Sequence, residues 1–204
     1  MGKELSIPDL KIKGDQQFLH DELQARVFTR GDPSNFLHDV ANITVWRNCY
    51  PHAYRTIFFS TFQRTLAWAN NVYMTDDDDL MLIPYNESGV SYGHISFSRF
   101  SYSDSRRFCD LSRVMKAPGL AGSKEFKSFV QRAVYWCLHY FELSHMRLEV
   151  FSDNASAVRL YQDIGFKSID ETGLKLIKVA DELRWMDTEG AREGKTMLQM
   201  ELER

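Results

Sequence analysis

One segment, residues 106–151, restricts the fold of this chain more than any other feature of the sequence. Two strand-like runs, "RRFCDLSRVM" (106–115) and "HMRLEVF" (145–151), flank a stretch whose apolar residues recur at helical spacing over residues 126–137. The loop "KAPGLAGS" (116–123) separates the first run from the helix with one proline and two glycines. Because a helix that connects two strands returns the second strand parallel to the first, the segment predicts a parallel βαβ crossover.

The segments on either side of this crossover extend it into a single α/β domain. The strands are expected at residues 25–30, 79–85, 90–100, 106–115, 145–151, 166–179 and 195–204. Helices are expected at residues 31–48 and 54–72, around 126–137, and between 154 and 165, with a loop at 49–54, a hairpin turn at 86–89 and a charged insertion at 181–194. We therefore predict one domain over residues 25–204, preceded by an extension, residues 1–24, that contains a short amphipathic helix.

Charge and cysteine content exclude several classes of function. The chain has 204 residues, with 25 lysines and arginines against 28 aspartates and glutamates, and this net charge of −3 argues against a general nucleic-acid binder. The three cysteines are widely spaced and form no C-x-x-C pair, so neither a zinc site nor a disulfide framework is expected. No long apolar run predicts a membrane span or a leader, and we expect a cytoplasmic protein without a metal.

The stretch "NASAVRLYQDIGF" predicts a short helix with well-defined ends. Asn154 can cap its start through a side-chain oxygen, and Gly165 can end it in the left-handed conformation, after which Phe166 packs back. The apolar face of this helix consists of Ala157, Leu160 and Ile164. Tyr161 lies beside that face, on the same side as Asn154, so a polar-tipped aromatic and an amide share the rim of a buried stripe. Without a functional role, Tyr161 is explained as a half-buried aromatic whose hydroxyl lies in water.

This helix and the strand before it resemble the most recognisable segment of the GCN5-related N-acetyltransferase (GNAT) superfamily. The matching positions are Leu148, Val150, Asn154, Ala157, Leu160, Tyr161, Gly165 and Phe166. The loop "KAPGLA" is similar to the coenzyme A signature of the family, R/Q-x-x-G-x-G/A, with Lys116, Gly119 and Ala121 at the defined positions and Gly122 as an alternative last position. Taken without the resemblance, this loop before a helix is either a tight turn or an anion site.

The resemblance implies the GNAT fold, a mixed central sheet of about seven strands in which two parallel strands splay apart, with helices on both faces. It implies acetyl-CoA or another acyl-CoA as the cofactor, lying between the splayed strands. The pantetheine arm is expected along Arg113, Val114 and Met115, and beside Asn154, Ala157 and Tyr161. The pyrophosphate is expected at residues 116–124, that is Lys116, Ala117, Gly119, Leu120, Ala121, Gly122, Ser123 and Lys124.

The same resemblance implies direct transfer of the acyl group to an amine, with Tyr161 as the general acid that protonates the departing thiolate. An ammonium acceptor must first lose a proton. His94 and Asp110 are the candidate bases, with Ser112 on the same strand face as Asp110, and a relay through water is the alternative. Each candidate also has a structural explanation, because a strand histidine often forms structural hydrogen bonds and an aspartate often pairs with an arginine.

The acceptor is the least defined part of this prediction. "WRN", residues 46–48, resembles a bacterial GNAT subgroup that includes enzymes acylating nucleotide-linked deoxyamino sugars. On that basis the substrate-binding residues are predicted to be Trp46, Arg47, Asn48, Tyr54, Arg55, Phe58 and Arg99, with Arg47, Arg55 and Arg99 gripping a diphosphate. The acyl group is acetyl or longer.

Three other functions remain open from the sequence. The acidic run "TDDDD", residues 75–79, is either a solvated loop or an attraction for a cationic acceptor such as an aminoglycoside. A protein N-terminus or lysine is another possible acceptor, and a coenzyme A-binding protein without catalysis is a third reading. A homodimer is predicted through the terminal strand, residues 195–204.

Overall fold

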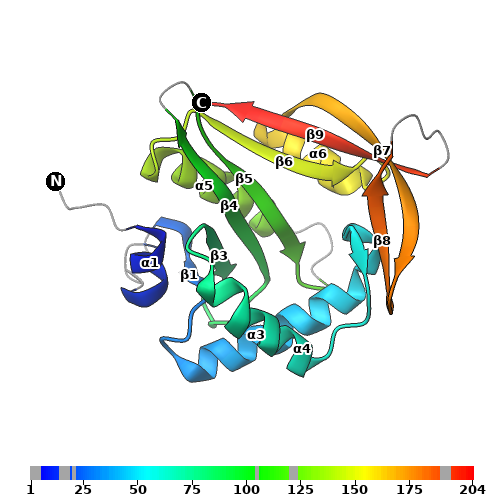
Figure 1. The fold of residues 1–204 in the computed structure, drawn as a ribbon. Coiled ribbons are helices and arrows are strands. Elements are labelled where there is room, and N and C mark those ends of the chain that lie inside the picture. The colour runs from blue at the N-terminus through cyan, green and yellow to red at the C-terminus, as the bar shows by residue number, and fades with distance from the viewer. Residues whose placement is uncertain (1–5, 14–18, 20–21, 104–105, 120–123, 189–193) are drawn as a thin grey trace.

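The computed structural model describes residues 6–13, 19, 22–103, 106–119, 124–188 and 194–204. These residues form a nine-stranded sheet in the order β1-β3-β4-β5-β6-β9-β7-β8-β2 (Figure 1). The strands are β1 (Ala25–Val27), β2 (Thr56–Ile57), β3 (Asp79–Pro84), β4 (Gly93–Ser103), β5 (Arg106–Lys116), β6 (His145–Phe151), β7 (Lys167–Val179), β8 (Glu182–Asp187) and β9 (Lys195–Glu203). The helices are α1 (Ile7–Lys13), α3 (Pro33–Cys49), α4 (Phe62–Asn71), α5 (Lys124–Tyr140) and α6 (Ala155–Ile164), with short 3-10 helices at Pro51–Ala53 and Tyr73–Thr75. The predicted α/β class and mixed sheet are confirmed.

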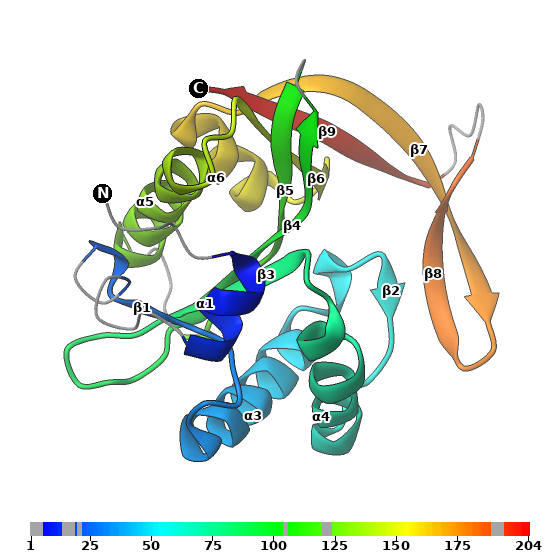
Figure 2. The same cartoon turned by 60° about the vertical axis from the view of Figure 1, so that its left-hand side comes forward.

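Helices cover both faces of the sheet (Figure 2). Alternate residues of β3 point to the two faces. Leu80 and Leu82 belong to the main core, which also contains the apolar faces of α1, α5 and α6. Met81 and Ile83 point to the opposite face and pack under α3 and α4. The short helix predicted in residues 1–24 is α1, and it buries two apolar residues in the main core.

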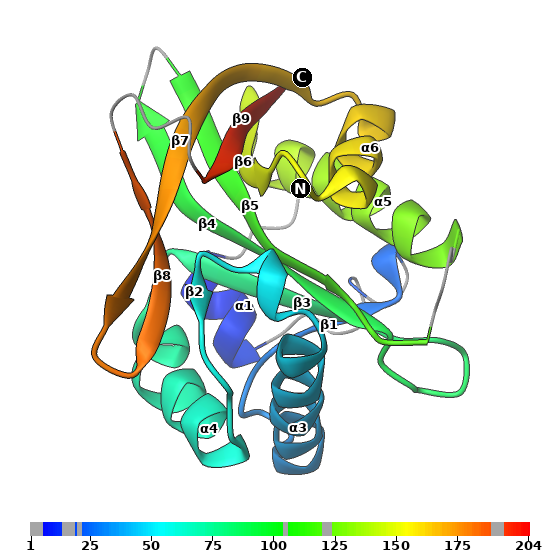
Figure 3. The ribbon, with the colours of Figure 1, turned by 90° about the vertical axis from the view of Figure 1, so that its right-hand side faces the viewer.

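The parallel crossover predicted from residues 106–151 is present, and its two strands separate along their length. β5 and β6 pair in parallel from Phe108 opposite His145 to Asp110 opposite Arg147. Beyond that point β5 continues on β4 and β6 continues on β9, so the two strands diverge (Figures 1 and 3). This divergence creates an opening in the middle of the sheet, while each of the two strands stays paired with its other neighbour.

Two β-bulges shape the β4–β5 ribbon. In β5, Arg113 and Val114 both face Ile95, and Arg113 has a φ of 48°. In β4, Arg99 and Phe100 both face Cys109, and Arg99 has a φ of 55°. Positive φ at a residue other than glycine costs free energy, so these bulges need support from their surroundings.

Consecutive aspartates supply that support. The Asp78 carboxylate accepts the Phe100 N–H at 2.9 and 3.1 Å, and the Asp79 carboxylate pairs with the Arg113 guanidinium at 2.5 Å. Asp79 is only 2% exposed. The acidic run was expected to be either a solvated loop or a site for a cation, whereas its last two residues hold the bulges of β4 and β5.

Three sequence predictions about the sheet are corrected. Residues 54–61 are not helical, because Thr61 caps α4 by accepting the Arg64 N–H at 3.2 Å and the preceding β2 pairs with β8. The predicted charged insertion contains β8, which forms a hairpin with β7. The terminal strand β9 lies between β6 and β7, so it has no free edge with which to pair across a dimer.

None of the helices in the described ranges combines the length and the apolar character that crossing a bilayer requires.

Candidate active site

The helix α6 is fixed at both ends by the residues that its sequence predicts. Asn154 Oδ1 accepts the Ala157 N–H at 3.4 Å, and Gly165 adopts the left-handed conformation with a φ of 116°. Phe166 is buried and packs edge-on against the Tyr161 ring, with 6.0 Å between ring centroids. These local interactions hold Tyr161 in one position on the wall that α6 presents to the sheet.

Tyr161 is more buried than the expected half-buried rim residue. Its side chain is 7% exposed, and burial raises the pKa of its hydroxyl above the ordinary value, so the phenol stays protonated at neutral pH. Within the described part of the chain, no hydrogen bond engages this hydroxyl. A buried, protonated phenol with an uncommitted hydroxyl is available to a bound molecule.

A channel of about 190 Å³ lies between the diverging parts of β5 and β6. The structure brings six of the predicted cofactor-binding residues to its walls: Arg113, Val114, Met115, Asn154, Ala157 and Tyr161. Ser112 also lines the channel, and its hydroxyl lies 3.2 Å from that of Ser98. The predicted pantetheine region is therefore one continuous concave surface, made of the end of one strand and the first two turns of one helix.

The other predicted cofactor-binding residues lie near the start of α5. Lys116 is half-buried at the end of β5, and the Ala117 N–H is already donated to the Tyr92 carbonyl at 3.0 Å, so it is not free for a phosphate. Gly119 has a φ of 82° and open space around it, and Lys124 is exposed. Leu120, Ala121, Gly122 and Ser123 lie outside the described residues.

A second cavity, of about 360 Å³, lies between the sheet and the helices α3 and α4. Its walls come from α3, the segment around β2, α4, β3, β4 and β5. Tyr54 and Arg113 line both this cavity and the channel, so the two spaces are neighbours that share these side chains as walls. Of the predicted substrate-binding residues, Arg47, Tyr54 and Phe58 line the cavity. We call this space the α3–α4 cavity.

The α3–α4 cavity carries positive charge. Arg47, Arg64 and Arg113 line it, and none of the described residues in its lining is a carboxylate. Arg64 pairs with Glu182, and Arg113 pairs with Asp79. Arg47 instead donates to the Thr56 carbonyl at 2.9 Å and rests against the rings of Tyr54 and Phe58. Burial lowers the pKa of Arg47, an effect that its hydrogen bond with the Tyr54 hydroxyl and the charge of Glu182 oppose.

His94 forms part of the wall of the α3–α4 cavity and is 2% exposed. Its ring stacks on Trp46 with 5.9 Å between centroids, and among the described residues neither ring nitrogen has a hydrogen-bond partner of normal geometry. Burial, together with the charges of Arg113 and Arg47, lowers the pKa of His94 to about 3. The imidazole is therefore neutral at physiological pH and a weak base.

Several predicted residues lie outside the α3–α4 cavity. Asp110 is buried away from both cavities and pairs with Arg99 and Arg147, and the Arg99 side chain is 67% exposed. Arg55 lines the channel and pairs with Glu149 and Asp187 at 3.2 and 2.9 Å. The predicted convergence of Arg47, Arg55 and Arg99 on one diphosphate is not found, because the three side chains face different spaces.

Asn48 and Trp46 have structural surroundings. The Asn48 side chain exchanges two hydrogen bonds with the backbone of Ser60, each of 2.8 Å, and thereby ties α3 to the segment before α4. Trp46 is buried beneath His94 and Met115. Arg64 and Trp68 were not among the predicted lining residues, because their side chains reach the cavity only through the packing of α4 against α3.

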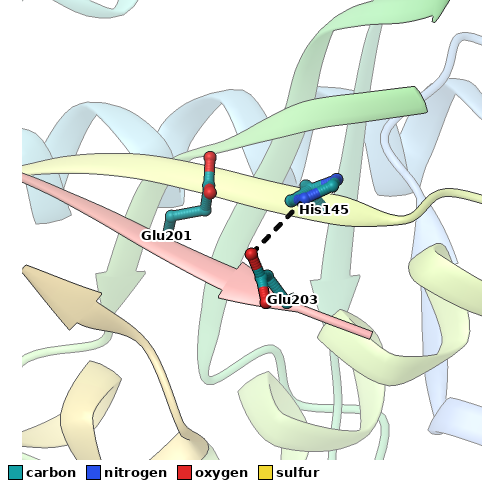
Figure 4. Close-up of side chains that lie close together, drawn as sticks. All are labelled: His145, Glu201 and Glu203. Atoms are coloured by element: carbon teal, nitrogen blue, oxygen red, sulfur yellow. Dashed lines mark ion pairs between the residues drawn. The ribbon is translucent and has the colours of Figure 1, made fainter. Parts of the chain in front are cut away.

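A group of possible metal ligands lies elsewhere on the sheet (Figure 4). His145, Glu201 and Glu203, on the paired strands β6 and β9, have ligand atoms within 4.8 Å of one another. His145 Nε2 lies 3.7 Å from Glu203, while Glu201 is already paired with Arg106. Because that arginine competes with any cation, the geometry describes a surface ion-pair network between neighbouring strands.

Comparison with known proteins identifies the fold. No protein-family model matches the sequence, and no curated protein matches it. The crystal structure of spermidine N-acetyltransferase from Vibrio cholerae in complex with CoA and spermine superposes with a TM-score of 0.64 at 18% identity, covering 90% of this chain and 96% of that one. Ribosomal-protein-alanine N-acetyltransferase from Brucella melitensis superposes with a TM-score of 0.62 at 16% identity, covering 88% and 99%. The chain therefore has the fold of these N-acetyltransferases, the fold that the GNAT resemblance implies.

Proposed function

We propose that this protein is an N-acyltransferase that transfers an acetyl or longer acyl group from coenzyme A to an amine. One observation carries the proposal: the channel between β5 and β6 adjoins the α3–α4 cavity, and Tyr54 and Arg113 belong to the walls of both. A thioester in the channel and an amine in the cavity would meet at that junction, as a direct transfer requires. The likeness of the fold to N-acetyltransferases, one of them solved with CoA, supports this assignment.

The chain supplies the groups that the reaction needs. The amine nitrogen attacks the thioester carbon, the carbon–sulfur bond breaks, and its electron pair stays on sulfur. The Tyr161 hydroxyl, in the channel wall, donates a proton to that sulfur. Because burial raises the pKa of Tyr161, the difference between its pKa and that of a thiol exceeds the ordinary ~1.5 units. Full transfer of the proton is therefore more uphill, and the phenol shares its proton with the sulfur in a hydrogen bond while the carbon–sulfur bond breaks. In the bulge of β5, the backbone N–H of Val114 is the proposed donor to the thioester oxygen.

The amine nitrogen must lose a proton before it attacks the thioester. The geometry favours water, rather than a side chain, as the base that takes this proton. His94 lines the cavity, but its lowered pKa leaves it a poor base. Asp110 is held between two arginines and lines neither space. We therefore propose a water relay from the α3–α4 cavity to solvent.

The acceptor is proposed to be a small-molecule amine. A nucleotide-linked amino sugar, the acceptor inferred from "WRN", keeps support from the aromatic and basic cavity but loses the three-arginine grip on a diphosphate. A polyamine or a protein N-terminus is the second candidate. It is favoured because the similar structures include a spermidine N-acetyltransferase and a ribosomal-protein-alanine N-acetyltransferase. The described part of the chain places three arginines and no carboxylate in the lining of the cavity, which disfavours a polycation.

Two measurements test the proposal. Isothermal titration should detect binding of acetyl-CoA and CoA by the full chain. A thiol-release assay should then detect turnover with at least one member of a panel: dTDP- and UDP-linked amino sugars, an aminoglycoside, spermidine and a peptide with a free N-terminus. Failure to bind coenzyme A would reject the function, whereas binding without turnover on any amine favours a non-catalytic coenzyme A-binding protein. Activity on the peptide alone would reject the small-molecule acceptor.

A further inference from the structure

We propose that the acceptor amine also carries an anionic group, a carboxylate or a phosphate, which pairs with Arg47 in the α3–α4 cavity. The inference rests on the proposed function and narrows its substrate class. It starts from a difference among the three arginines of that cavity: Arg64 and Arg113 each have a carboxylate partner, and Arg47 has none among the described residues.

An arginine held without a counter-ion in a partly buried place costs free energy, and the surroundings of Arg47 show how it is held. Its guanidinium carbon lies 3.9 Å from the centroid of the Tyr54 ring and 4.2 Å from that of Phe58. One amino group donates to the Thr56 carbonyl at 2.9 Å, while its buried Nε donates to no described residue. The Tyr54 hydroxyl also takes part in a hydrogen bond with Arg47. The guanidinium plane is thus fixed by neutral partners and no carboxylate is paired with it among the described residues, as in a preformed site for an anion.

The rest of the cavity does not neutralise this charge. Among the described residues its lining contains no carboxylate, and His94 offers no charge of either sign at neutral pH. The Glu182 carboxylate acts on Arg47 electrostatically but is paired with Arg64 and Arg184, and Asp79 is paired with Arg113. A ligand with a negative group is therefore attracted, and a polycation such as spermidine is repelled.

The position of Arg47 also fits an acceptor that reaches the channel. Tyr54 contacts the Arg47 guanidinium and lines both the cavity and the channel. A small molecule with its anion on Arg47 therefore lies along a wall that leads to the junction where an amine would meet a thioester. The required acceptor has an amine at one end and a negative group at the other.

The test measures binding to the protein saturated with CoA, so that no turnover occurs. Matched probes separate the two anions: L-alanine against L-alaninamide for a carboxylate, and glucosamine 6-phosphate against glucosamine for a phosphate, with spermidine as a polycation. We expect the anionic member of at least one pair to bind about tenfold or more tightly than its neutral partner, a preference that weakens with added salt.

Arginine variants assign that preference to one side chain. R47Q should abolish it, R47K should keep part of it, and R184Q should leave it unchanged, because Arg184 pairs with Glu182 yet does not line the cavity. CoA affinity measured for each variant reports that the fold is intact, and R47K with the salt series serves where R47Q fails to fold.

Three results overturn the inference. They are equal or tighter binding of the neutral probes or of spermidine, no binding of any anionic probe, and an unchanged preference in R47Q. Each is obtained with coenzyme A bound, so the proposed function can stand while the inference falls. Failure of the wild-type protein to bind CoA instead overturns the proposed function itself.

Discussion

The channel and the α3–α4 cavity share Tyr54 and Arg113, yet they are built from different material. The channel is walled mainly by the end of β5, the end of β6 and the first turns of α6, with small or apolar side chains such as Val114 and Ala157. Among the described residues, its charged side chains besides Arg113 are Arg55 and Glu149, which pair with each other. The cavity takes side chains from six elements and holds Arg47, which pairs with no carboxylate in the described ranges.

This difference separates two kinds of recognition. A narrow wall of two strand ends and one helix fits one invariant ligand such as a coenzyme arm, and it tolerates little change in volume. A wall of individual aromatic and charged side chains discriminates among acceptors one contact at a time. Substitutions in the channel should therefore affect every acceptor equally, whereas substitutions in the cavity should affect some acceptors more than others.

Replacing Tyr161 by phenylalanine should give the largest effect. Removal of a general acid typically lowers the rate by about 10²–10⁴-fold, and we expect kcat in the thiol-release assay to fall by about 10³-fold for every acceptor. Phenylalanine keeps the edge-on contact with Phe166, so the affinity for coenzyme A measured by titration should change little.

Tyr102 provides a matched control for this substitution, because it is exposed and lines neither cavity. Tyr102→Phe should leave both kcat and coenzyme affinity unchanged. An undiminished kcat in Tyr161→Phe would refute the role of the phenol as an acid while leaving the coenzyme channel itself intact.

Asp79→Asn tests the junction between the two spaces. Removing one partner of a buried ion pair costs about 3–5 kcal/mol, and because Arg113 is 34% exposed we expect about 2 kcal/mol lower free energy of unfolding. Since Arg113 lines both spaces, KM should rise for the coenzyme and for the acceptor together. Urea unfolding and steady-state kinetics measure the two effects.

The neighbouring Asp77 is exposed, so Asp77→Asn should change stability by less than about 0.5 kcal/mol. If the two aspartate variants behaved alike, the ion pair of Asp79 with Arg113 would have no part in holding the bulge of β5.

The channel and the α3–α4 cavity also differ in how far the sequence predicts them. The cap at Asn154, the stop at Gly165 and the place of Tyr161 lie within one helix, and short-range rules predicted them. The parallel pairing of β5 and β6 followed from one continuous strand–helix–strand segment. Contacts within a few residues, or within one supersecondary unit, leave a pattern that a single sequence retains.

The α3–α4 cavity depends on contacts between distant residues, and no local pattern encodes them. Arg64 meets Glu182 from a position 118 residues away, and the pairing of β2 with β8 replaced a helix that the apolar run at residues 54–61 predicted. Asp110 was a candidate base by its strand position, but arginines from β4 and β6 pair with it. The role of every predicted site residue stays a prediction until the variants are measured.

Ala157→Leu should separate the channel from the cavity. The larger side chain enters a space of about 190 Å³ and would crowd a bound coenzyme arm. Overpacking of this kind costs about 1–3 kcal/mol, here lost from the free energy of CoA binding. We expect CoA to bind about tenfold more weakly, with the affinity of acceptor probes for the α3–α4 cavity unchanged. Ala155→Leu, on the exposed side of α6, is the matched control, and equal losses in both variants would count against the channel as the coenzyme site.

His94→Phe should change the pH dependence of stability. Because the folded protein lowers the pKa of His94 from 6.5 to about 3, the unfolded chain takes up a proton first as the pH falls. The contribution of the neutral imidazole is complete above pH ~6.5 and is lost as the pH falls below it, at up to ~1.4 kcal/mol per pH unit. Phenylalanine keeps the stacking on Trp46 without a titrating group, so its unfolding free energy between pH 7 and 5 should fall less steeply than that of the wild type. Parallel urea titrations of the two proteins measure this difference; identical slopes would mean that His94 protonates in the folded state, and would restore it as a candidate base.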